Sequence, residues 1–206
     1  MEQEEQRTIP TLGSIYFAIK NISYEEVIKR LNISKHKICS AKDAFACLYS
    51  QDTQSNVIVS HQTENWIFLY LKHGSYYDCK SIVQMLLNNS KNKVNFYFSD
   101  SCIDCYQWII SENGKIIREF SYSMSIISNN FGDYITKIEK KFIQNLVLEN
   151  EGNEFIFGED VADSVFESTC EIKKIPESLL FTTGQINGMC KFSVAKKCKS
   201  LIISLL

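Results

Sequence analysis

Hydrophobic and polar positions alternate along several short stretches of the chain, which is the pattern of half-buried β-strands. Within residues 94–99, apolar side chains at Val94, Phe96 and Phe98 alternate with more polar ones. Residues 66–71 are instead apolar at every position, which is typical of a central strand covered on both faces. Apolar and β-prone residues predict further strands at residues 14–19, 37–40 and 56–60.

Other stretches carry apolar residues at helical spacing, behind residues that can cap a helix N-terminus. Ser23 with Glu26, and Thr136 with Glu139, have the spacing of a capping box, and Asp78 can cap a third helix. The alternation of strands and helices predicts a single-domain α+β fold. We expect a mixed, mainly antiparallel sheet of about six to eight strands, with helices packed on one or both of its faces.

The segment from Ile103 to Met124 predicts a hairpin whose turn lies at residues 112–114, Glu-Asn-Gly. A two-residue Asn-Gly turn would place Trp108 opposite Glu119 and would put the apolar residues of the two strands on different faces. A three-residue loop with a left-handed glycine gives one coherent apolar face instead, so we favour that loop. This register predicts that Trp108 lies directly across from Arg118.

Composition and charge exclude several classes of protein. The chain has 206 residues, 22 Lys and Arg against 24 Asp and Glu, and a net charge of −2, which is not the basic excess of a nucleic-acid binder. The first residues do not resemble a signal peptide, and the final apolar run, residues 201–206, is much shorter than the ~20 residues of a membrane span. We therefore expect a cytoplasmic protein with no nucleic-acid partner and no membrane partner. Residues 1–180 are expected to form the domain, and residues 181–206, in which every charged residue is a lysine, a basic extension packed on it.

Short motifs follow one another from the first capped helix to Leu180. They are Ile22-Ser-Tyr-Glu-Glu-Val-Ile, Asn65-Trp66, Cys105-Tyr-Gln-Trp108, Glu112-Asn-Gly114, Ile117-Arg-Glu-Phe-Ser-Tyr122, Gly132, Thr136-x-x-Glu139, Gly158-Glu-Asp-x-Ala162 and Ile175-Pro176. In their order they resemble a group of uncharacterised small bacterial proteins, similar to the immunity and accessory proteins of polymorphic toxin systems. The resemblance implies a toxin-like protein partner and carries over no catalytic residue.

Arg118 is the most informative single residue, because the expected register points a cation toward an apolar face. Such a cation needs a carboxylate or an aromatic ring nearby. Stacking on Trp108 with Asp104 or Glu139 beside it would make Arg118 a structural anchor, whereas an anionic ligand would make it a binding residue. The structural role is the favoured alternative, because buried ion pairs and cation–π contacts are frequent in ordinary folds.

Acidic and aromatic residues provide a candidate partner surface. Glu159, Asp160 and Asp163 could form a functional acidic cluster, although acids are also favoured at any helix N-terminus. Tyr76, Tyr77 and Trp66 could likewise present an aromatic patch to a partner or complete the core.

The thiols and imidazoles give little sign of metal or covalent chemistry. Cys102 and Cys105 have C-x-x-C spacing but lack the second ligand pair of a zinc site, so no metal and no cofactor are expected. His36, His61 and His73 have no nucleophile at a recognisable spacing. We therefore expect a non-enzymatic protein-binding protein, an immunity-like inhibitor of a cognate bacterial toxin. The alternative is a small-molecule or anion-binding enzyme centred on Arg118, with Cys102, Cys105 or a histidine as the reactive group.

Overall fold

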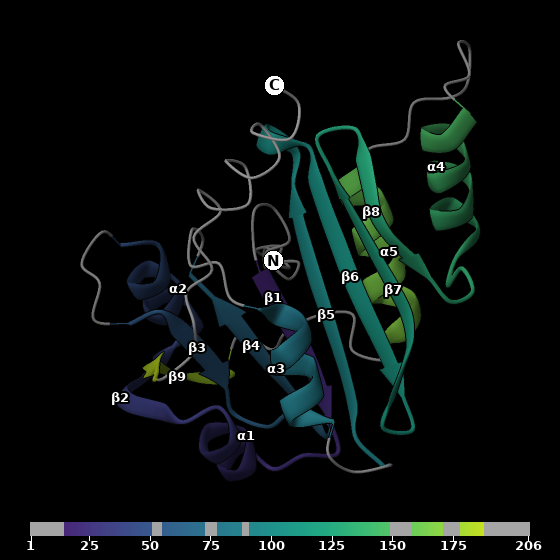
Figure 1. Cartoon of the computed structure of the whole chain (residues 1–206). Coiled ribbons are helices and arrows are strands. Elements are labelled where there is room, and N and C mark those ends of the chain that lie inside the picture. Colours follow the sequence, from purple (N-terminus) through teal and green to yellow (C-terminus); the bar gives the residue numbers. More distant parts are fainter. Residues whose placement is uncertain are drawn as a thin grey trace, which may run out of the picture.

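In the part of the chain that the structure describes, nine strands form one central sheet (Figure 1). The computed structural model describes residues 15–50, 55–72, 78–87, 91–148, 158–170 and 178–187. The strands are β1 (Ile15–Lys20), β2 (Ile33–Ser40), β3 (Val57–Ser60), β4 (Trp66–Leu71), β5 (Lys93–Asp100), β6 (Cys105–Glu112), β7 (Lys115–Ser123), β8 (Ile126–Phe131) and β9 (Leu180–Ile186). The helices are α1 (Tyr24–Arg30), α2 (Ala41–Tyr49), α3 (Cys79–Leu86), α4 (Lys137–Leu148) and α5 (Gly158–Thr169), with a short 3-10 helix at Ser101–Ile103.

The strand order is β2-β9-β3-β4-β1-β5-β6-β7-β8, and every described pairing of neighbours is antiparallel. From β5 to β8 the chain meanders between neighbouring strands. The first strand, β1, instead lies between β4 and β5, so the connection through α3 crosses over it. The expected single-domain α+β fold is thus confirmed, with more strands than the six to eight expected.

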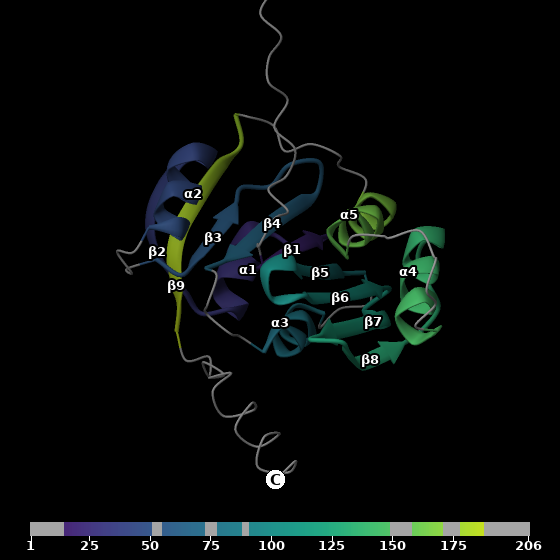
Figure 2. The ribbon, with the colours of Figure 1, turned by 90° about the horizontal axis from the view of Figure 1, so that it is seen from above.

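The sheet is covered by helices on both faces (Figure 2). In β1, Tyr16 and Ala18 point to the face covered by α2, α4 and α5, which we call the first face. Phe17 and Ile19 point to the second face, which is covered by α1 and α3. Because side chains alternate across a strand, the central strands must be apolar on both faces, and all six residues of β4 are indeed buried.

Three of the helix starts are those that the sequence predicts. The side chains of Ser23, Asp78 and Thr136 accept hydrogen bonds from the backbone N–H groups of Glu26, Ser81 and Glu139. None of the described helices combines the length and apolar character that a membrane-spanning helix needs.

The register of the β6–β7 hairpin differs from the predicted one. Asn113 and Gly114 both have positive φ, 50° and 73°, and form a two-residue turn closed by the pair Glu112 and Lys115. A β-bulge between Ile110 and Ser111 then shifts the pairing by one residue. The bulge restores the single apolar face that we had assigned to a longer loop.

Because the turn has two residues instead of three and a bulge follows it, the predicted pairing of Trp108 with Arg118 is wrong. Trp108 pairs with Phe120, and Arg118 pairs with Ile110. Trp108 and Arg118 still project from the same face, as diagonal neighbours.

The expected domain boundary at residue 180 coincides with the first residue of β9. This strand lies inside the sheet, between β2 and β3, so residues 180–186 belong to the domain. The rest of the basic extension, residues 188–206, lies outside the described residues.

Candidate functional site

The side chain of Arg118 is completely buried and forms an ion pair with Glu139 of α4. Its Nε atom lies 2.8 Å from Glu139 Oε1, and both side chains have no solvent exposure. Asp104, the other acid considered as a partner, accepts a hydrogen bond from the hydroxyl of Tyr122 instead, at 3.0 Å. The partner is therefore the carboxylate that the capping box places in the first turn of α4.

Glu139 is the centre of this cluster. Its Oε1 atom also accepts a hydrogen bond of 2.7 Å from the indole N–H of Trp108, and its Oε2 atom accepts one from the backbone N–H of Ile135. The backbone N–H of Glu139 donates to Thr136 Oγ1 at 3.0 Å. One carboxylate thus connects β6, β7 and the N-terminus of α4, and its charge is balanced by Arg118.

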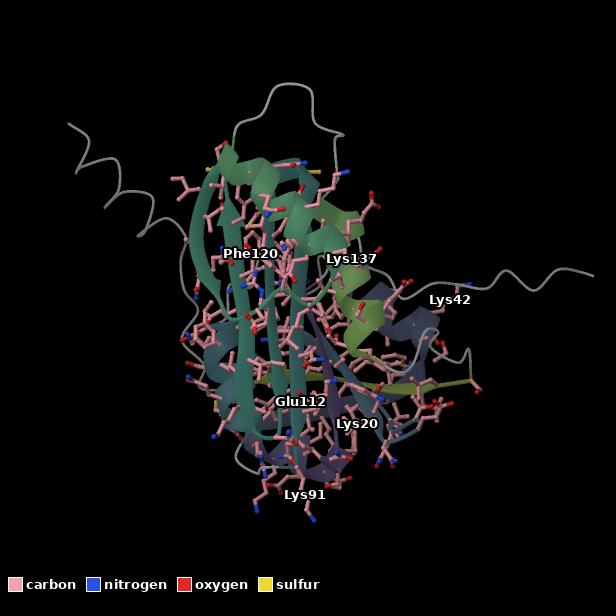
Figure 3. The ribbon with its side chains drawn as sticks, turned by 90° about the vertical axis from the view of Figure 1, so that its right-hand side faces the viewer. Lys20, Lys42, Lys91, Glu112, Phe120 and Lys137 are labelled. Atoms are coloured by element: carbon pink, nitrogen blue, oxygen red, sulfur yellow. The ribbon has the colours of Figure 1, made fainter. Side chains whose placement is uncertain are left out.

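The guanidinium of Arg118 also reaches the end of β8. Its Nη1 atom donates to Asn130 Oδ1 at 2.9 Å and to the carbonyl of Phe131 at 2.8 Å. Rings of Phe120 and Tyr134 lie 5.7 and 5.4 Å from the guanidinium carbon, within the range of cation–π contacts. Figure 3 views this side of the molecule, with Phe120 labelled.

Trp108 is not the ring on which Arg118 stacks, so that expected contact is wrong. The indole instead stacks on Phe120, with ring centroids 4.4 Å apart, while its N–H bonds the carboxylate. Of the terminal nitrogens of Arg118, Nη2 is buried without a hydrogen-bond partner among the described residues. A side chain with no exposed surface offers no route to a ligand from solvent, so these contacts favour the structural role of Arg118.

The predicted acidic residues lie on a different element. Asp160 is exposed on α5, and Asp163 is partly buried, where its charge contributes to raising the pKa of Tyr16. Glu167, which we did not predict, is exposed and lies seven residues after Asp160, so it extends the same helix face. The helical period was the signal that could have identified it.

The remaining predicted partner residues cannot be placed on this surface. Glu159 belongs to α5, but its side chain is not among those described, and Tyr76 and Tyr77 lie outside the described residues. Trp66 is fully buried, and the amino groups of Lys20 and Lys93 lie 5.3 and 5.9 Å from its ring centroid.

A buried tyrosine cluster on the first face was not predicted. Tyr16, Tyr70 and Tyr97 come from β1, β4 and β5, and Tyr16 stacks on the other two at centroid distances of 5.7 and 5.1 Å. Burial is the main cause that raises the pKa of each tyrosine well above its usual value, and it raises the pKa of the adjacent Cys170 to about 11. The cluster could have been predicted from the sequence, because the alternation of side chains places a tyrosine at an inward position of each of the three strands.

The thiols and imidazoles of the described residues form no evident reactive centre. Cys102 is exposed, whereas burial raises the pKa of Cys105, which disfavours the reactive thiolate. Within the described residues, no three His, Cys, Asp or Glu side chains form a group that could hold a metal ion. The ring of His61 lies 5.0 Å from that of Tyr24 and is tilted against it by 39°. The side chain of His36 and the whole of His73 lie outside the described residues.

No family model matches the chain, and neither the curated proteins nor the solved structures contain a significant match. The resemblance to immunity and accessory proteins therefore stays a prediction from the motifs.

Proposed function

We propose that this chain is a non-enzymatic protein-binding protein, an immunity-like inhibitor that neutralises a cognate bacterial toxin by binding it. The observation that carries the proposal is the exposed acidic face of α5. Asp160 and Glu167 lie on the outer side of this helix, while Val161, Val165 and Phe166 on its inner side are buried against the sheet. The acids are therefore held on a preformed surface, which a basic partner can bind with little loss of conformational entropy.

The alternative, an enzyme centred on Arg118, is less well supported. Its guanidinium is enclosed, and its charge is balanced by Glu139. Substrate would have to displace an internal ion pair in order to reach it, which would cost several kcal/mol, roughly 3–5 by analogy with other buried pairs.

The proposal can be tested in two steps. The tagged chain is first isolated from its native host, and each stoichiometric partner is identified by mass spectrometry. That partner is then expressed alone and together with the chain. We expect growth inhibition by the partner alone, rescue by the chain, and weaker association at high salt.

The charge-reversal variant Asp160→Lys/Glu167→Lys should lose rescue, whereas Glu112→Lys should keep it. Glu112 is an exposed acid at the end of β6 and is labelled in Figure 3. Recovery of the chain alone, from cells that express the neighbouring genes, would contradict the proposal. Equal rescue by the wild-type chain, the charge-reversal variant and Glu112→Lys would also contradict it.

A further inference from the structure

The two edge strands of the sheet differ in how they are protected against pairing with another strand. At one end, β2 carries Lys35 and Lys37 and is interrupted by a bulge between them. Lysines and bulges are the usual devices that prevent edge-to-edge association. At the other end, β8 also has a bulge, at Ser128, but its sequence Ile-Ile-Ser-Asn-Asn-Phe contains no charged residue and no proline. In the described part of the chain, only β7 pairs with it.

This uncharged edge also displays apolar side chains. Ile126 is 56% exposed and Phe131 is 55% exposed, and they are paired with Ser123 and Glu119 on the second face of the sheet. On that face, Lys80 of α3 forms an ion pair with Glu119 of β7, and the Nζ and Oε2 atoms lie 2.6 Å apart. Figure 2 shows β8 at the end of the sheet, with α4 over the opposite face. A neutral strand with open backbone groups and exposed apolar side chains is thus left without a partner from the described chain.

We propose that β8 pairs antiparallel with β8 of a second copy of this chain, so that the two sheets continue through a two-fold axis. Antiparallel pairing places the start of one strand beside the end of the other. Ile126 of one copy then lies near Phe131 of the other, and an axis perpendicular to the sheet keeps both on the same face.

The second copy is the occupant that fits best, because it brings a strand of matching character. Self-pairing of β8 sets no charge against a like charge and gives the open backbone groups of both copies their hydrogen-bond partners at once. The same operation at β2 would bring Lys35 and Lys37 of the two copies together. The contrast assigns the interface to β8.

The experiment compares the wild-type chain with two variants by sedimentation velocity, from about 1 to about 200 µM. The chain has a mass of 23.8 kDa, and the wild type should approach twice that mass as its concentration rises. The double variant Ile126→Lys/Phe131→Lys brings like charges together across the axis and should raise the dissociation constant at least about tenfold. Ile38→Lys is the matched control, because Ile38 is 58% exposed on β2, and it should dimerise like the wild type.

A wild-type chain that remains monomeric over the whole range would overturn the proposal. A dimer that is lost in Ile38→Lys but kept in the β8 variant would do so as well. All three substituted side chains are exposed, so we expect each variant to fold. A cooperative thermal unfolding transition of each variant checks this. The result is independent of toxin neutralisation, which is tested through Asp160 and Glu167 on α5.

Discussion

Replacement of Arg118 by methionine tests the role of the buried ion pair. Methionine keeps most of the length of the side chain but removes the charge and all hydrogen bonds of the guanidinium. Glu139 would then be a carboxylate with no exposed surface, left with the N–H donors of Trp108 and Ile135. Removing one member of a buried pair typically destabilises a protein by about 3–5 kcal/mol, mainly because the other charge stays uncompensated.

A second substitution separates the charge from the packing. In Arg118→Met/Glu139→Gln no charge is buried, and the amide oxygen of the glutamine can still accept the hydrogen bond of Trp108. We therefore expect the double variant to be more stable than Arg118→Met, by about 1 kcal/mol or more. Glu139→Gln alone leaves the guanidinium buried without its counter-charge and should lose a comparable amount to Arg118→Met.

The measurement is urea denaturation followed by tryptophan fluorescence, since Trp66 and Trp108 are both fully buried. A loss below about 1 kcal/mol for Arg118→Met would refute the structural role. Additive losses in the double variant would show that the two side chains do not act as a pair. A normally stable Arg118→Met that had lost binding or activity would support the ligand alternative.

Two further predictions concern the backbone and the buried tyrosines. Gly132 has a φ of +84°, and a Cβ atom there would lie 2.0 Å from the carbonyl oxygen of Ile117. Gly132→Ala should therefore lower the free energy of unfolding by at least ~2 kcal/mol. An unchanged thermal midpoint would contradict this prediction. Stability should be fully present below about pH 9 and fall above it, because Tyr16, Tyr70, Tyr97 and Cys170 have raised pKa values when folded, so the unfolded chain ionises first. Between its unfolded and folded pKa, each group should lower the free energy of unfolding by about 1.4 kcal/mol per pH unit. Urea titrations at pH 8 to 11 that show no decline in the free energy of unfolding would refute this prediction.

Local signals were sufficient to predict the helix starts and the faces of the strands. Ser23, Asp78 and Thr136 cap helices because their side chains reach the free N–H groups of the next turn, which depends only on nearby residues. Likewise, the period of two correctly placed Trp108 and Arg118 on one face.

Long-range pairing was less predictable. The shorter turn and the bulge, which has no strong sequence signal, each shift the register by one residue, and together they move the partner of Arg118 from Trp108 to Ile110. The insertion of β9 between β2 and β3 joins segments about 120 residues or more apart in the sequence, and no local pattern encodes that choice. The shared carboxylate of Glu139 was within reach of prediction, since the capping box had already placed it at the start of α4.

The Arg118 cluster and the open edge of the sheet are physically connected. The guanidinium is hydrogen-bonded to the side chain of Asn130 and the carbonyl of Phe131, which are the last two residues of β8. Edge strands fray readily because they pair on one side only. Here the hydrogen bonds from the buried Arg118 order the end of β8. Less conformational entropy is therefore lost when another strand pairs with β8. The ion pair with Glu139 therefore stabilises the fold and also keeps the proposed dimerisation edge ordered.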